Sequence, residues 1–126
     1  MSTQQIHDKF KVFVGAVQSG GSIDSVASAV EGFVRDARVA PKSIGVEYLE
    51  GAKKLVLSLG YRDDESPYEV KLETLSLGKL GSLDAADIGR LESAMTAATA
   101  KVASIICHEL FVTETGDCRM VVMRRA

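Results

Sequence analysis

The stretch Ser43–Leu77, SIGVEYLEGAKKLVLSLGYRDDESPYEVKLETLSL, alternates apolar and polar residues along three successive runs. A period of two places every second side chain on the same face of a β-strand. The segments between the runs contain the glycine, proline and charged residues that are typical of turns. We therefore predict an antiparallel β-meander over residues 43–77, with one apolar face and one charged face.

The turn around Gly51-Ala52 specifies how the first two runs pair. It places Tyr48 opposite Leu55, Val46 opposite Leu57 and Ile44 opposite Leu59. A slip of one residue would turn the leucines toward the charged face, so the alternation selects this register. The same reasoning pairs the second run with the third, with Tyr61 opposite Tyr68, Leu59 opposite Val70 and Leu57 opposite Leu72.

Apolar residues at helical spacing precede and follow the meander. Ile6, Phe10, Phe13, Val14 and Val17 fall on one helical stripe, which predicts a helix from about residue 3 to residue 18. After the break at Ser19-Gly20-Gly21, a second helix is predicted from about Ile23 to Arg38, which makes residues 1–40 a helical hairpin. Residues 82–103 predict an alanine-rich helix with Ile88, Leu91, Met95, Ala98 and Val102 on its buried stripe. Residues 105–125 predict a β-hairpin.

The expected fold class is therefore α+β, with the element order α-α-β-β-β-α-β-β and a largely antiparallel five-stranded sheet covered by helices. We find no internal sequence repeat, and 126 residues are enough for a single domain, residues 1–126, with its own core. No motif identifies a family. The element order alone resembles that of type III secretion chaperones, which are small, acidic, dimeric proteins.

Composition and charge restrict the class of protein and its expected partners. Hydrophobic residues make up 46% and charged residues 25% of the chain, as in soluble globular proteins. The net charge of -2 attracts neither nucleic acid nor an anionic membrane. The first residues lack the features of a signal peptide, and no stretch approaches the roughly 18 apolar residues of a spanning helix. We expect a cytoplasmic protein without membrane contact.

Arg119, Arg124 and Arg125 form the one cluster of basic residues. No aromatic residues alternate with them to stack on bases, so nucleic-acid binding is not expected.

Residues with catalytic or metal-binding chemistry are few. Cys107-His108-Glu109 contains the ingredients of an activated nucleophile, but successive residues of a strand point to opposite faces. Cys118 and Cys107 would lie roughly 20 Å apart at about 3.3 Å per residue, too far for a disulfide or a shared metal. The acidic run Asp63-Asp64-Glu65 does not match a calcium-binding loop. We expect no catalytic residue, no metal and no cofactor.

The C-terminal hairpin is apolar on both faces. With Thr115-Gly116 at the turn, one face holds Cys107, Phe111, Met120 and Val122, and the other holds Leu110, Val112, Val121 and Met123. Such a strand pair must be covered by helices, by the rest of the sheet or by another copy of the chain. The last possibility predicts a homodimer.

Two functions from different classes remain open. The first is a noncatalytic, self-associating interaction module, whose protein partner the sequence does not identify. The second is a small-molecule-binding protein or enzyme with a pocket between sheet and helices. The weak candidates to line that pocket are Tyr48, Tyr61, Tyr68, Cys107 and His108. Rapid alkylation of one cysteine at neutral pH would favour the second function, because it would indicate a depressed thiol pKa.

Overall fold

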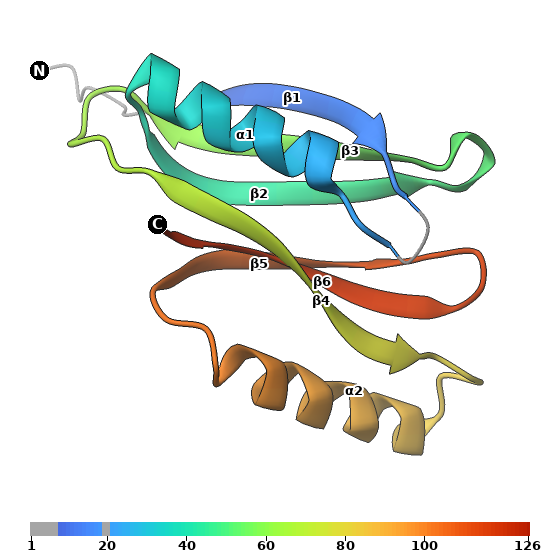
Figure 1. Ribbon diagram of the computed structural model, residues 1–126. Coiled ribbons are helices and arrows are strands. Elements are labelled where there is room, and N and C mark those ends of the chain that lie inside the picture. The colour runs from blue at the N-terminus through green and yellow to red at the C-terminus, as the bar shows by residue number, and fades with distance from the viewer. Residues whose placement is uncertain (1–7, 19–20) are drawn as a thin grey trace, which may run out of the picture.

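The computed structural model describes residues 8–18 and 21–126, which form six strands and two α-helices (Figure 1). The elements are, in chain order, β1 (Lys9–Ala16), α1 (Asp24–Ala37), β2 (Ala40–Leu49), the 3-10 helix η1 (Glu50–Ala52), β3 (Lys54–Arg62), β4 (Val70–Lys79), α2 (Ala85–Thr99), β5 (Ile105–Val112) and β6 (Asp117–Arg125). The strands form two antiparallel sheets, sheet A in the order β1-β3-β2 and sheet B in the order β4-β6-β5. The α+β class is confirmed, whereas the expected order and the single five-stranded sheet differ from the structure.

The chain folds as two consecutive β-α-β-β units with the same topology. Unit 1 runs from β1 to β3 and unit 2 from β4 to β6, and in each unit the last strand lies between the other two. The cross-strand registers also correspond, because Phe10 opposite Gly60 in unit 1 matches Leu72 opposite Met123 in unit 2. The structure therefore contains a repeat of architecture that the sequence does not reveal.

Residues 9–16 form a strand, so the helix predicted over residues 3–18 is wrong for this part; residues 1–7, 19 and 20 lie outside the described residues. The sequence KFKVFVGA satisfies both periods, because Phe10, Val12 and Val14 also alternate with the residues between them. Aromatic and β-branched side chains favour a strand. Pairing with β3, from Lys9 opposite Tyr61 to Ala16 opposite Lys54, decides between the two periods.

The predicted pairing of β2 with β3 is confirmed residue by residue. Ile44 lies opposite Leu59, Val46 opposite Leu57 and Tyr48 opposite Leu55. The connection differs from a two-residue turn, because η1 is followed by Lys53 with a φ of 50°. The third predicted pairing is wrong. β1 occupies the free side of β3, and β4 instead pairs with β6 in sheet B.

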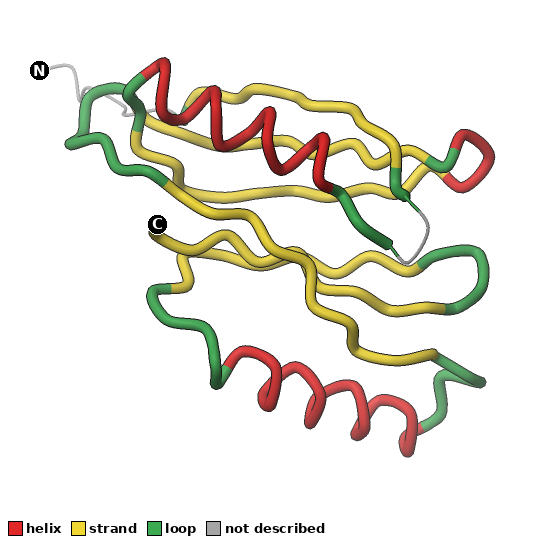
Figure 2. Tube along the Cα trace, viewed as in Figure 1, coloured by secondary structure: helices red, strands yellow, loops and turns green. Residues whose placement is uncertain are grey.

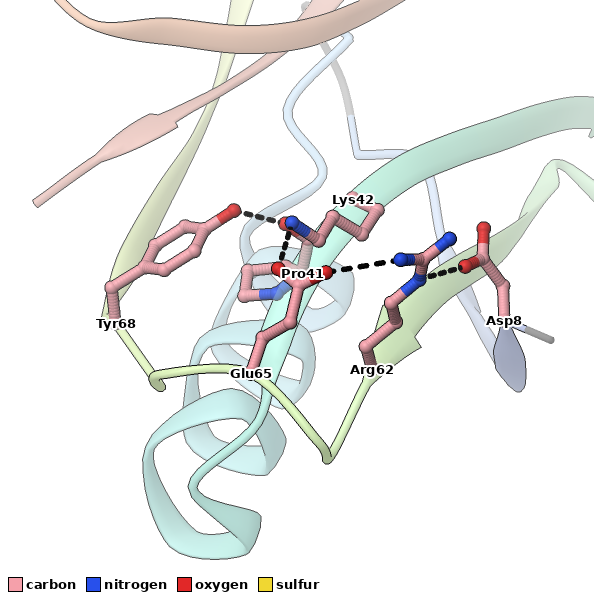
Figure 3. Close-up of polar contacts among 6 residues, drawn as sticks. All are labelled: Asp8, Pro41, Lys42, Arg62, Glu65 and Tyr68. Atoms are coloured by element: carbon pink, nitrogen blue, oxygen red, sulfur yellow. Dashed lines mark hydrogen bonds and ion pairs between the residues drawn. The ribbon is translucent and has the colours of Figure 1, made fainter. Parts of the chain in front are cut away.

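The connection over residues 63–69 carries the chain from sheet A to sheet B. Ion pairs hold its beginning, since the Arg62 guanidinium donates to Asp8 at 2.7 Å and to Glu65 at 3.0 Å (Figure 3). Lys42 also pairs with Glu65, and the Tyr68 hydroxyl donates to the Pro41 carbonyl. The acidic run after β3 therefore anchors a crossover between sheets.

Helix α1 lies on one face of sheet A and against β4, while β2 and β5 bring the two sheets into direct contact (Figure 1). The predicted helix is confirmed, and Val26, Val30 and Val34 on its core side are each 1% exposed or less. The Glu31 carboxylate accepts the Leu72 backbone N–H at 2.8 Å, which ties the helix to sheet B. The main core joins both units and contains, besides the α1 residues, Leu55, Leu57 and Leu59 from sheet A and Val70, Leu72, Phe111, Val121 and Met123 from sheet B.

The C-terminal hairpin is confirmed, but its register is one residue away from the predicted one. Val112, not Thr113, lies opposite Cys118, because a four-residue loop ends at Gly116 with a φ of 84°. Cys107 and Phe111 therefore share the core face with Val121 and Met123, while Leu110 and Val112 share the other face with Met120 and Val122. Both faces are apolar, as predicted, and the chain itself covers much of each.

Helix α2 lies along the second face of sheet B and is shorter than the predicted range 82–103 (Figure 2). Asp84 caps it by accepting the Asp87 backbone N–H at 2.9 Å. Asp87 is 4% exposed, pairs with Arg90 and accepts the Leu83 N–H, whereas Ile88, expected in the buried stripe, is 49% exposed. Beneath α2, Met120 and Val122 have no exposed surface.

Leu57 of β3 and Met120 of β6, at matching positions of the two middle strands, test the packing beneath the two helices. We expect Leu57→Ala and Met120→Ala each to lower the free energy of unfolding by about 2–5 kcal/mol, because each leaves a cavity in a fully buried position. Urea denaturation measures the change. Val112→Ala, at a 42% exposed position of β5, serves as the control and should change it by less than about 0.5 kcal/mol. A loss below about 1 kcal/mol for either buried position would contradict this packing.

Candidate functional site

Sheet A has one face that carries no helix within the described ranges. Helix α1 packs on the opposite face, where the Phe13 and Phe33 rings lie 5.9 Å apart. Alternation in the three strands defines the free face, which we call the outer face: Phe10, Val12 and Val14 of β1, Val56, Ser58 and Gly60 of β3, and Ser43, Gly45 and Glu47 of β2. Phe10 is 67% exposed, and Val12 and Val14 are each 59% exposed.

The outer face has a ridge and a trough. The three large apolar side chains of β1 form the ridge, while glycine and serine dominate the neighbouring positions of β3 and β2. A shallow depression of about 220 Å³ lies along β2 and β3, with Gly45 and Ser58 in its lining. A Cβ at Gly45 would come within 2.7 Å of the Ser58 Oγ, so the glycine is needed for this close approach.

The same face of unit 2 is buried. Phe10, Ser58 and Gly60 of unit 1 correspond by register to Leu72, Val121 and Met123 of unit 2. Those unit 2 residues are 6%, 0% and 0% exposed, because they pack against unit 1. The outer face is thus the counterpart of a surface that the other unit uses for packing.

The three candidate tyrosines lie in three separate environments. The Tyr48 hydroxyl donates to Glu114 at 2.6 Å, and its ring centroid is 6.0 Å from that of Phe111. The Tyr61 ring packs edge-on against Phe33 at 5.2 Å. The Tyr68 ring stacks under a guanidinium, with the Arg125 Cζ 4.1 Å from its centroid. These tyrosines do not form the common pocket predicted between sheet and helices.

Cys107 and His108 lie on opposite faces of β5, as strand alternation predicts. Cys107 pairs with Met123 on the core face, and His108 pairs with Val122 on the other face, where it is exposed. Burial raises the pKa of the Cys107 thiol to about 11, and burial also raises the pKa of Cys118. Both cysteines are free thiols. Within the described ranges, no three His, Cys, Asp or Glu side chains gather as a metal site.

The outer face does not follow from the sequence prediction, because that prediction places the residues of β1 in a helix. The signal for it is that Phe10, Val12 and Val14 occupy every second position of the segment. Aromatic and β-branched side chains such as these favour a strand. The predicted charged face of the meander is also less charged than expected. On β2 and β3 it consists largely of Ser43, Gly45, Ser58 and Gly60.

Comparison with known proteins found no family model, no curated protein and no solved structure that matches this chain. Within the described ranges, neither helix is long and apolar enough to cross a membrane.

Cysteine reactivity tests the environments of both thiols. Because a thiolate is the reacting form and burial raises the pKa of Cys107 and of Cys118, we expect slow alkylation of both by iodoacetamide at neutral pH. Mass spectrometry of a time course measures the rate, with urea-unfolded protein as the fast control. Rapid, stoichiometric labelling of one cysteine in the folded protein would contradict this assignment and favour an activated thiol.

Proposed function

We propose that the protein is a noncatalytic interaction module that self-associates through the outer face of sheet A. The observation that supports it is the row of Phe10, Val12 and Val14, each more than half exposed on one strand face. A contiguous exposed apolar patch bordered by polar groups is typical of a protein–protein interface. A solitary exposed valine would carry no such meaning, but these three share one face of one strand.

A second copy of the chain suits this face because the face is self-complementary. A two-fold axis in the interface, parallel to the strands, would place the β1 ridge of each copy over the β2 trough of the other. Phe10 would then face Ser43, and Val12 would face Gly45. An isologous contact of this kind uses the same patch twice and closes after two subunits. Face-to-face sheets pack about 10 Å apart, so small residues opposite large ones allow side chains to interdigitate.

The charges around the patch favour association over repulsion. Glu47 and Lys54 lie at one end of the face with opposite charges. At the other end, the Arg62 guanidinium is already paired with Asp8 and Glu65 (Figure 3). An apolar centre with a polar, charge-balanced rim is the usual anatomy of an interface.

The basic residues near the C-terminus support a protein partner over nucleic acid. The Arg124 guanidinium donates to the Glu73 carboxylate at 3.0 and 3.1 Å. Arg125 stacks on Tyr68, while Arg119 lies at the junction of the two sheets. These arginines therefore do not present one basic surface for phosphates. We also propose the cytoplasm as the location, because two free cysteines fit a reducing compartment.

Charged substitutions in the ridge test self-association. We expect wild-type protein to be a dimer at micromolar concentration, and Phe10→Lys and Val12→Lys each to weaken dimerisation at least tenfold, because each buries an unpaired ammonium opposite Ser43 or Gly45 of the other copy. Light scattering coupled to gel filtration across a dilution series measures the mass. Ile88→Lys, at a 49% exposed apolar position of α2, is the matched control and should leave the dimer intact.

Two results would overturn the proposal. One is a monomer mass for wild-type protein at every concentration. The other is a dimer that neither ridge substitution weakens, which would locate the contact elsewhere. Circular dichroism of the variants confirms that any loss of dimer does not come from unfolding.

A further inference from the structure

A pocket lies where the two units meet, at the turn ends of the β2–β3 and β5–β6 hairpins. Its volume is about 390 Å³, within the usual range for small-molecule sites. We call it the seam pocket, and the lining residues that matter here are Gly21, Tyr48, Lys53, Glu114, Asp117 and Arg119. Lys53 belongs to unit 1 and Arg119 to unit 2, so a ligand here would contact both halves of the protein.

Arg119 is the central donor of this pocket. It lies on β6 opposite Phe111, and its Nε is buried without a hydrogen-bond partner among the described residues. A guanidinium has five N–H donors and no acceptor, and leaving a buried donor without a partner is costly. The Nε itself is enclosed, so Arg119 would meet an acceptor in the pocket with the terminal N–H groups of its guanidinium.

The chain makes room for this guanidinium at Gly21. Gly21 has a φ of 84°, and a Cβ built on it would overlap the Nε, Cζ and Cδ of Arg119. A residue with a side chain would be strained at this φ and would also displace the arginine. The backbone of Gly21 thus lies directly against Arg119.

The carboxylates of the seam pocket already have donors within the chain. Glu114 accepts the Tyr48 hydroxyl at 2.6 Å, a bond that lowers the pKa of Glu114 and raises the pKa of Tyr48 to about 12. Asp117 accepts the Thr115 hydroxyl at 2.9 Å. By contrast, the ion pairs found among the described residues include neither Lys53 nor Arg119. The acidic groups of the pocket thus accept hydrogen bonds from hydroxyls of the chain. The Lys53 ammonium lies close enough to Glu114 to lower its pKa, whereas Arg119 makes no ion pair within the described ranges.

We propose that the seam pocket binds a small organic carboxylate, with Arg119 as the principal ligand and Lys53 as a second cation. A planar carboxylate matches the parallel N–H groups of a guanidinium and can accept two bonds at once. Lys53, the exposed residue just before β3, adds a second positive charge to the pocket. This site is separate from the outer face, so it does not depend on self-association.

Succinate is the probe for this proposal, with the uncharged succinamide and inorganic phosphate as comparison compounds. We expect succinate at millimolar concentration to raise the melting temperature and to shift the amide NMR signals of residues 113–119, because ligand binding stabilises the folded state. Arg119→Gln should weaken binding at least tenfold and Lys53→Gln less. Arg35→Gln is the matched control, because Arg35 is exposed and its ion pair within the described ranges is with the adjacent Asp36.

If Arg119→Gln folds poorly, Lys53→Gln still tests the site, because Lys53 is exposed and its replacement should leave the fold intact. No signal shift with succinate would overturn the proposal. Equal effects of succinamide would exclude recognition of charge, and equal effects of phosphate would exclude a carboxylate-selective site. Unchanged succinate binding in a folded Arg119→Gln protein would also overturn it.

Discussion

The whole architecture depends on burying the helix-free face of sheet B against unit 1. Val121 and Met123 of β6 have no exposed surface, and they share one core with Val30 of α1 and Leu57 of β3. The Glu31 carboxylate adds a directional bond to the Leu72 backbone, in a place where β4 passes the helix. Without this contact, each unit would be a three-stranded sheet with a helix on one side and an uncovered face on the other.

The helix-free face of unit 2 packs against unit 1, whereas the helix-free face of unit 1 stays uncovered within the described ranges. Unit 2 buries its helix-free face in unit 1, but the equivalent face of unit 1 has no third unit to cover it. The residues there reflect the difference, because Ser58 and Gly60 stand where unit 2 has Val121 and Met123. Phe10, Val12 and Val14 nevertheless remain large and apolar. This combination of a ridge and small neighbours suits a partner that interdigitates, and it motivates the proposal of self-association.

The local features of this fold could be predicted from the sequence, whereas the pairings between distant segments could not. The β2–β3 register follows from alternation across a short connection, and α1 follows from the spacing of Val26, Val30 and Val34. β1 was misassigned because its apolar residues satisfy a helical and a strand period together, and only pairing with β3 decides between them. The pairing of β4 with β6 could not be predicted from the local pattern either. The connection over residues 63–69 is long enough for the chain to pass from sheet A to sheet B.

The candidate surfaces were hidden for the same reason. Tyr48 was a candidate, but its partner Glu114 lies 66 positions away in the sequence, and Arg119 reaches the same pocket from another sheet. The outer face required both the strand assignment of β1 and its pairing beside β3. Likewise, the common topology of the units lies in their backbone pairing and not in their residues. Leu57 and Met120, for example, are both fully buried at matching positions of the middle strands, with different side chains.

Isotope-filtered NMR on a mixture of ¹³C-labelled and unlabelled protein tests the central claim most directly, because it detects only contacts between copies. The account predicts intermolecular NOEs from the Phe10 ring and the Val12 and Val14 methyl groups to Ser43, Gly45 and Ser58 of the other copy. Intermolecular NOEs confined to Leu83, just before α2, and to Ile88 of α2 would contradict it, as would their complete absence at millimolar concentration.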